Sequence, residues 1–345
     1  MERATSVNSI DAVRVLLDSG VSPNVKKDGI YTPLCSAIRD NRCDLFSLLL
    51  SRGADPNLPA SEYPAWKCIT HNRLHFLPDL LAAGVDLLDP PGIAECAVRE
   101  NNQPALEWLV AQKDRVDLNA RDPTTSSTAL TTAIRENRRD LVEFLLRHGA
   151  DPNRRGQDWP IYMATRSPDI LALLLPHITD LSTHKAVVER AVQANQLESI
   201  KLLLAAGASP EWKAGGVFSP LTTALRERYA HIVRYLLDEA RADPNAPGEH
   251  LPLVKAIRRL EGDKAHGFAM IELLLSKGAD PNVCYRGWNA VMQAIENRDA
   301  KLLRLLKEKG LPVDLEVTDE AGRGVLQMAE DDGWEEGVAV LKADA

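Results

Sequence analysis

The sequence predicts an all-α protein built from stacked repeats, and three observations carry this prediction. The string GADPN begins at Gly53, Gly149 and Gly278, with degraded copies between and beyond them. The nine intervals from Gly20 to Gly310 average about 32 residues, within the range of known repeat periods. The third observation is that each unit contains two short amphipathic segments, which are marginal as isolated helices. A small residue also precedes the glycine by 16 positions in six copies, at Ala4/Gly20, Ala37/Gly53, Cys68/Gly84, Ala133/Gly149, Ala191/Gly207 and Ala294/Gly310.

Each unit is predicted to be a pair of helices followed by a hairpin loop. In residues 32–41 (TPLCSAIRDN), Thr32 is the expected N-cap and Pro33 takes the first helical position. Asn41 is expected to end this helix, because asparagine tolerates the left-handed conformation. A second helix is predicted over 44–51, where leucines recur at helical spacing. Two such short helices must bury their apolar stripes against neighbouring units, which makes a solenoid. The same asparagine recurs at Asn72, Asn101, Asn137, Asn195 and Asn297.

These features resemble the ankyrin repeat family along the full length of the chain. The matching strings are TPL at Thr32–Leu34, SPL at Ser219–Leu221 and LPL at Leu251–Leu253, together with the GADPN copies. The resemblance implies stacked helix-turn-helix pairs with short outward hairpins and a concave binding groove. One departure is that the histidine that follows TPL in the family is replaced here, so its usual hydrogen bond to the threonine hydroxyl is expected to be missing. The replacements are Cys35, Trp66, Tyr162 and Thr222, and about six extra residues lie around Leu260–Phe268.

The domain prediction is one continuous right-handed array over residues 1–345, with about eleven units. The first unit is truncated, which fits either an atypical cap or a fragment of a longer chain. Residues 311–345 form the expected C-terminal capping unit, and 314–336 carry nine acidic residues and one arginine. A solvated polar cap is favoured there over a partner site.

Composition limits the possible functions. The net charge of −8 argues against broad binding to a phosphate backbone, so no nucleic acid partner is expected. The sequence contains neither an apolar run of membrane-spanning length nor a secretory signal, so a location in the cytoplasm or nucleus is expected. The chain is also expected to be a monomer. The five cysteines are too scattered for a disulfide framework or a zinc site and are expected to be mostly buried.

The sequence carries no recognisable catalytic motif, and neither a cofactor nor a metal is predicted. His71 and His75 have the i, i+4 spacing of a metal pair, but Asn72 is expected to end the helix between them, so they should diverge.

Arginines recur two positions after the small residue of the first helix. The family resemblance implies that this position faces the concave groove. The residue that follows is often acidic (Asp40, Glu100, Glu136, Glu227), so an alternative is that each arginine pairs with a carboxylate of a neighbouring repeat. The arginines are Arg39, Arg99, Arg135, Arg166, Arg226 and Arg258.

Nine of the 17 aromatic residues fall in hairpins or at the starts of first helices, an excess that favours a recognition surface. They are Tyr31, Tyr63, Trp66, Trp159, Tyr162, Trp212, Phe218, Tyr285 and Trp288. The alternative for some of them, above all Trp66 and Tyr162, is packing between hairpins. The two patterns converge in the fifth and sixth units, where Ser167 leaves Arg166 without an acidic neighbour. The predicted principal binding residues are Arg121, Arg135, Arg154, Arg155, Trp159, Tyr162 and Arg166, and the secondary ones are Arg39, Trp66, Arg99, Trp212, Arg226, Tyr285 and Trp288.

The leading functional hypothesis is a non-catalytic scaffold that binds a protein or peptide in its groove. An arginine cluster beside aromatic residues suits an acidic or phosphorylated peptide. The alternative is an enzyme whose active site, assembled from several repeats in the groove, acts on an acidic small molecule; a nucleic-acid binder ranks third.

Overall fold

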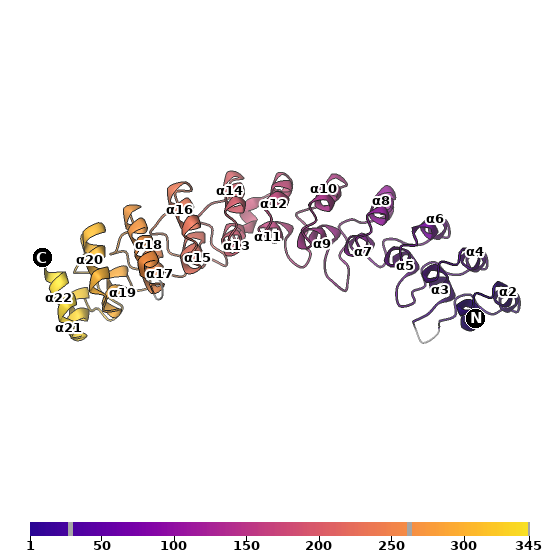
Figure 1. The fold of residues 1–345 in the computed structure, drawn as a ribbon, viewed down its shortest axis with the longest axis horizontal. Coiled ribbons are helices and arrows are strands. Elements are labelled where there is room, and N and C mark those ends of the chain that lie inside the picture. Colours follow the sequence, from indigo (N-terminus) through magenta and orange to yellow (C-terminus); the bar gives the residue numbers. More distant parts are fainter. Residues whose placement is uncertain (27–29, 261–263, 344–345) are drawn as a thin grey trace. The chain divides into compact units, whose positions relative to one another are not determined.

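The computed structural model describes residues 1–26, 30–260 and 264–343 and divides into two compact units, 1–163 and 164–345. Helices follow one another in pairs in both units (Figure 1), as the sequence predicts. The first unit contains α1 (Glu2–Ser6), α2 (Ile10–Asp18), α3 (Pro33–Arg39), α4 (Cys43–Ser51), α5 (Pro64–Thr70), α6 (Leu77–Ala82), α7 (Ile93–Arg99), α8 (Gln103–Ala111), α9 (Ala129–Arg135) and α10 (Arg139–Arg147). The short helix α11 (Pro160–Ala164) crosses the boundary.

The second unit continues the same pattern. It contains α12 (Pro168–Leu174), α13 (Val187–Gln193), α14 (Leu197–Ala205), α15 (Pro220–Arg226), α16 (Ala230–Asp238), α17 (Pro252–Arg258), α18 (Lys264–Ser276), α19 (Ala290–Glu296), α20 (Ala300–Lys309), α21 (Val325–Asp331) and α22 (Glu335–Lys342). Within the described residues the only β-pairing is isolated bridges in hairpins, such as Tyr285 with Trp288, so the fold is all-α. Whether the two units form one continuous right-handed stack stays a prediction.

Stacking follows the solenoid rule inside each unit. In the first unit α3, α5, α7 and α9 pack side by side in one row, and in the second α13, α15, α17, α19 and α21 do the same. Each of these first helices also packs on its second helix, for example α9 on α10. The apolar stripe of each second helix is removed from water by the packing of neighbouring helices. Fully buried examples are Leu49, Val142 and Leu145.

The predicted helix ends are largely confirmed. The Thr32 hydroxyl accepts from Cys35 N at 3.2 Å, and Pro33 begins α3. Asn41 ends the helix with φ 59°, and four of the other predicted asparagines have φ near 55°. The prediction for Asn297 is wrong. It stays right-handed with φ −76°, and Arg298 takes the left-handed position with φ 48°.

The GADPN glycines have the predicted left-handed backbone. Gly53, Gly149 and Gly278 have φ of 82°, 91° and 88°. A Cβ atom at any of the three would meet open space, so only the backbone conformation disfavours a larger residue there.

The asparagine of GADPN clamps the next hairpin. Asn57 Nδ2 donates to Gly84 O at 3.1 Å, while Asn57 Oδ1 accepts from Asp86 N at 2.7 Å. Asn119 makes the same two bonds in the first unit, and Asn245 and Asn282 make them in the second. Sequence reasoning assigned this asparagine only to the turn, whereas it links consecutive repeats.

The expected loss of hydrogen bonding at the former histidine position is only partly correct. Thr222 approaches the Ser219 hydroxyl at 2.8 Å, and Thr131 approaches the Thr128 hydroxyl at 3.2 Å. A threonine at this position therefore restores a side-chain bond at the helix start. The Cys35 thiol lies 3.6 Å from Glu62 O, and its contact with the Thr32 side chain opposes the rise that burial causes in its pKa.

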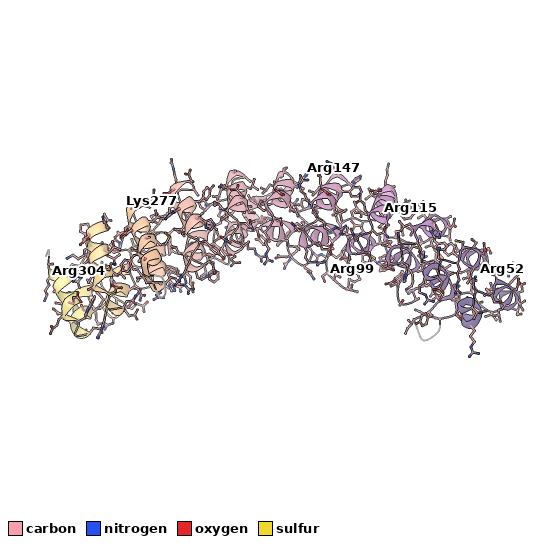
Figure 2. The ribbon with its side chains drawn as sticks, in the orientation of Figure 1. Arg52, Arg99, Arg115, Arg147, Lys277 and Arg304 are labelled. Atoms are coloured by element: carbon pink, nitrogen blue, oxygen red, sulfur yellow. The ribbon has the colours of Figure 1, made fainter. Side chains whose placement is uncertain are left out.

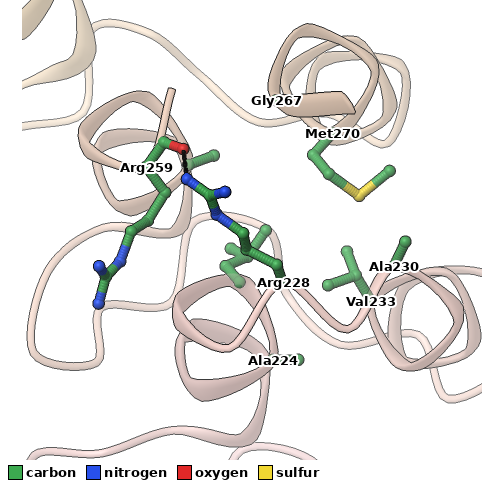
Figure 3. A pocket seen from close by; sticks show the side chains of 9 residues that line it. Ala224, Arg228, Ala230, Val233, Arg259, Gly267 and Met270 are labelled. Carbon is green, nitrogen blue, oxygen red and sulfur yellow. Dashed lines mark hydrogen bonds between the residues drawn. The ribbon is translucent and has the colours of Figure 1, made fainter. Parts of the chain in front are cut away.

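The extra residues change packing in the second unit. Of the predicted insertion, 261–263 lie outside the described residues, while Leu260 is buried and α18 extends to 13 residues. A cavity of about 20 Å³ lies between α15, α16, α17 and α18, next to Gly267 and Met270 (Figure 3). Arg228 lines this cavity and donates to Arg259 O at 2.9 Å. The cavity holds about one water molecule and is too small for a ligand.

Among the described helices, none combines the length and the apolar character needed to cross a membrane.

Candidate functional site

The arginine series lies on the row of first helices. Figure 2 shows Arg99 on the side of the first helices and Arg147 on the side of the second helices of the first unit. Three arginines of the series are neutralised by carboxylates. Arg39 contacts Asp40 at 2.8 and 3.2 Å, and Arg226 contacts Glu227 at 2.8 Å. These partners belong to the same repeat, so the alternative of pairing with a neighbouring repeat is wrong for these two.

Arg99 is the most heavily compensated member of the series. Its Nη1 lies 2.7 Å from Glu95 Oε2 and 3.4 Å from Asp122 Oδ2, and its Nε lies 3.5 Å from Glu100. Asp122 comes from the next hairpin, the one contact here that matches the predicted cross-repeat pairing. Glu95 is completely buried and also accepts from Thr132 Oγ1 at 2.9 Å. Burial raises the pKa of the Glu95 carboxyl, while Thr132 and Arg99 oppose the rise.

Arg135 differs because its partners are neutral. It donates to Ser127 Oγ at 3.2 Å, to Gln157 Oε1 at 3.4 Å and to Thr132 Oγ1 at 3.3 Å. The acidic residue that follows it, Glu136, pairs with Arg138 at 3.3 Å instead. In the described part of the chain Arg135 has no ion pair, although its charge acts on the Glu95 carboxyl and opposes the rise of that group's pKa.

The other predicted principal residues remain predictions as binding contacts. Arg121, Arg154 and Arg155 are exposed on the two hairpins on either side of α9 and α10, and Trp159 and Tyr162 are half-buried. Arg166 is exposed but belongs to the second unit, so its position relative to the other six stays a prediction.

The secondary aromatic residues differ in accessibility. Trp66 is only 9% exposed, and its ring lies 5.8 Å from that of Tyr63, so little of it is left for a ligand. Trp212 is half-buried on its hairpin, as are Tyr285 and Trp288 on theirs.

A second arginine that has no ion pair among the described residues lies in the second unit, inside a pocket that sequence reasoning did not assemble. This pocket, called the Arg258 pocket below, has a volume of about 140 Å³. Arg258 Nε donates to Gln293 Oε1 at 2.6 Å, and Arg258 Nη1 lies 3.0 Å from His250 Nε2. Trp288 Nε1 donates to the same Gln293 oxygen at 3.1 Å. The lining residues are His250, Leu251, Val254, Arg258, Tyr285, Arg286 and Trp288.

A sequence signal for this pocket existed. Arg258 is followed by Arg259 rather than by an acidic residue, the same feature that singled out Arg166. Tyr285 and Trp288 were predicted as secondary contacts, but His250 and Arg286 were missed. The hairpins of His250 and Arg286 belong to consecutive repeats, and only the stacking of these repeats brings the two side chains into one pocket.

His250 is held in one protonation state by its neighbours. Because an arginine can only donate, His250 Nε2 must accept from Arg258, and the neutral ring then carries its proton on Nδ1. Burial lowers the pKa of His250, and the charges of Arg258, Lys255 and Arg286 lower it further, while Glu249 acts in the opposite direction.

The acidic C-terminal segment is partly neutralised within the second unit. Glu336 pairs with Arg304 at 2.8 Å, Glu330 with Lys342 at 3.0 Å and Asp319 with Arg323 at 2.7 Å.

Comparison with known proteins agrees with this architecture. The family model for three ankyrin repeats matches residues 68–156, 94–184 and 188–283, and the single-repeat model matches 31–61. The chain therefore belongs to the ankyrin repeat family, whose repeats serve as protein-interaction scaffolds.

Several curated relatives share part of the chain. The human ankyrin repeat and SOCS box protein 6 is 29% identical over 247 residues, which cover 59% of this chain and 58% of that protein. The mouse protein of the same name is 30% identical over 246 residues with the same coverage. An ankyrin repeat-containing protein of Schizosaccharomyces pombe is 30% identical over 124 residues, 35% of this chain and 60% of that protein. The chain thus spans a little over half the length of the mammalian relatives that it matches.

Proposed function

We propose that the chain is a non-catalytic adaptor that binds an acidic or phosphorylated segment of a partner protein on the face formed by the first helices and hairpins. The centre of this site is the cluster of Arg121, Arg135, Arg154 and Arg155, with Trp159, Tyr162 and Arg166 as the other predicted contacts. The proposed molecule is a monomer in the cytoplasm or nucleus that needs no cofactor.

The observation that supports this proposal is the state of Arg135. Where the chain needs an arginine for structure, as at Arg99, it supplies carboxylates at 2.7–3.5 Å. At Arg135 the hydrogen-bond partners are hydroxyl and amide oxygens, which fix the guanidinium without a direct ion pair. Charge-assisted hydrogen bonds to a carboxylate or phosphate are about twice as strong as neutral ones.

The test measures binding of fluorescent peptide pools to the full chain, with acidic, phosphorylated and neutral pools compared. Truncating a central arginine or tryptophan of an interface costs about 2 kcal/mol or more. At about 1.4 kcal/mol per tenfold, Trp159→Ala combined with Arg166→Ala should weaken binding roughly a thousandfold. Arg135→Ala alone should weaken it at least tenfold.

The matched control is Arg147→Ala, which removes an exposed arginine from the side of the second helices. It should bind as the wild type does, and all variants should melt near the wild-type temperature. Binding should also weaken as salt rises. If the double variant retains full affinity for the acidic pool, the proposed centre is structural and the acidic C-terminal end becomes the better candidate.

A further inference from the structure

We propose that the Arg258 pocket is a separate binding site for one phosphorylated side chain, presented by an extended segment of a partner protein. The site lies wholly in the second unit and shares no residue with the cluster around Arg135. It therefore adds a second, chemically narrower contact to the proposed adaptor function and can fail or stand independently of it.

The pocket has a positive charge with no carboxylate in its lining. Arg258 and Arg286 contribute two guanidinium groups, and the lining residues include no aspartate or glutamate. Three acidic side chains lie around this lining: Glu320 packs against Gly287, next to Arg286, and the other two are bonded to neighbouring side chains. Glu249 pairs with the buried Lys255 at 2.7 Å, and Glu296 accepts from Gln293 Nε2 at 2.7 Å. Two guanidinium groups in a lining without carboxylates suit a doubly charged oxyanion such as a phosphate group.

The guanidinium of Arg258 is fixed before any ligand arrives. Gln293 holds its Nε, and His250 holds Nη1, both through neutral acceptors. Gln293 is itself oriented by Glu296, and by Asn297 at 3.1 Å. In the described part of the chain Nη2 of Arg258 has no hydrogen-bond partner and is the atom left for the ligand. A fixed side chain loses little entropy on binding, which favours affinity.

The walls of the pocket select size and shape. Tyr285 and Trp288 bridge the base of one hairpin, with Tyr285 N donating to Trp288 O at 3.0 Å. Arg286 at the tip of this hairpin lies 5.1 Å above the Tyr285 ring, which steadies the second guanidinium. Leu251 and Val254 form an apolar floor. A volume of about 140 Å³ is below the range of sites for drug-sized ligands and suits a single side chain.

The source of the phosphate is inferred from the position of the site. The pocket lies between two hairpins of consecutive repeats, next to α17, and is open on the side of the hairpins. A phosphoserine or phosphothreonine in an extended chain would place its phosphate between Arg258 and Arg286, while the flanking residues lie along the neighbouring hairpins. Free phosphate has the same charge but gains nothing from these flanks.

The experiment uses the full chain and three heptapeptide pools that differ only at the central residue, which is phosphoserine, glutamate or serine. We expect the phosphoserine pool to bind at least tenfold more tightly than the other two, as measured by fluorescence anisotropy. Arg258→Ala and Arg286→Ala should each lower the affinity about tenfold, the effect of one lost charge-assisted hydrogen bond. Binding of inorganic phosphate is measured in parallel, to test whether the pocket is a site for the free anion.

A second variant protects the test against a folding artefact. Arg259→Glu places a carboxylate directly after Arg258 on an exposed position, which recreates the Arg226–Glu227 arrangement and neutralises the guanidinium. It should lose the phosphoserine preference while melting like the wild type. Arg234→Glu makes the same charge change on the exposed face of α16 and should bind within about twofold of the wild type.

Three outcomes would overturn the proposal. The first is a wild-type chain that binds the three pools equally, and the second is an equal loss in Arg234→Glu and Arg259→Glu. The third is inorganic phosphate that binds as tightly as the phosphoserine pool, which would make the pocket a free-phosphate site. Because the cluster around Arg135 is itself proposed to bind phosphorylated peptides, the measurements are repeated in the Arg135→Ala background. The phosphoserine preference that remains there should still be lost on Arg258→Ala, which separates the two proposals.

Discussion

Arg99 in the first unit and Arg258 in the second occupy the same position of the repeat, yet their surroundings are opposite. Arg99 faces three carboxylates, whereas Arg258 faces an amide oxygen and an imidazole nitrogen. The difference arises from two neighbours in each helix. Four residues earlier stands Glu95 in one and Val254 in the other, and the next residue is Glu100 in one and Arg259 in the other. One repeat position can therefore serve either as a structural ion pair or as a charge kept for a ligand.

The difference between the two arginines is tested most directly by replacing each of them with alanine and measuring the stability of the variant. Arg99→Ala leaves the fully buried Glu95 carboxylate without its cation, and removing one partner of a buried pair costs about 3–5 kcal/mol. Since Arg99 is partly exposed, we expect about 3 kcal/mol. Arg258→Ala should cost less than about 1 kcal/mol, because Gln293 keeps its bond from Trp288. Urea unfolding of the two variants checks this, and equal losses would remove the distinction between the two arginines.

A second comparison concerns the hairpin glycines, which are alike in the two units. Gly149 and Gly278 have φ of 91° and 88°, and a Cβ would meet open space at both. Valine at either position should therefore cost about 1–2 kcal/mol, from backbone strain alone. Thermal melts of Gly149→Val and Gly278→Val should show similar decreases. A Gly149→Val variant that melts at the wild-type temperature would contradict this interpretation of the hairpin signature.

The predictable part of the fold was the part encoded locally. Thr32 and Pro33 mark a helix start, and Asn41 marks its end, because each acts within its own turn of the helix. The failure at Asn297 follows the same logic, since Arg298 stands one residue later and takes the left-handed conformation instead. The asparagine clamps were missed because each joins two hairpins about 30 residues apart.

The candidate site was less predictable for a related reason. The arginine positions followed from the repeat, but which arginines are neutralised depends on side-chain competition. Glu136 was expected to be available to Arg135 but bonds to Arg138. His250 and Arg286 lie in different hairpins, so no local pattern joins them to Arg258. Composition and spacing therefore identify the surface, and stacking decides which of its charges remain uncompensated.

Two buried carboxylates extend the comparison to pH. Glu189 of α13 occupies the position of Glu95 and is 2% exposed, but its Oε1 accepts from Gln193 at 2.6 Å and Thr223 at 3.2 Å rather than from an arginine. Burial raises the pKa of both carboxyls. The folded chain then binds protons more readily than the unfolded chain, so each group costs stability as pH rises above its unfolded pKa of about 4.5.

Glu189→Gln should therefore stabilise the chain at neutral pH, because the amide oxygen can keep both hydrogen bonds without a buried charge. We expect a gain of about 1 kcal/mol at pH 7 that fades as the pH falls through the raised pKa of the folded state and is lost by about pH 4.5. Glu95→Gln should show no such gain, since it removes the charge that pairs with Arg99. Urea unfolding at pH 4 and pH 7 measures both. A Glu189→Gln gain that is the same at both pH values would show that the charge is not its cause.

The smallest expected effect concerns Glu211, which stands where GADPN copies carry asparagine. Its Oε1 accepts from Asp243 N at 2.8 Å, as Asn119 Oδ1 does from Asp151 N at 2.7 Å in the first unit. A carboxylate cannot supply the second bond of the clamp, the donation that Asn119 makes to Gly149 O at 3.3 Å. Burial also raises the pKa of Glu211, so its charge costs stability at neutral pH. Glu211→Asn should therefore complete the clamp and stabilise the chain by about 0.5–1 kcal/mol, the net value of one hydrogen bond. Glu211→Ala, which forms neither bond, is the matched control and should melt below the wild type; a Glu211→Asn variant that melts with it would show that the clamp contributes nothing at this hairpin.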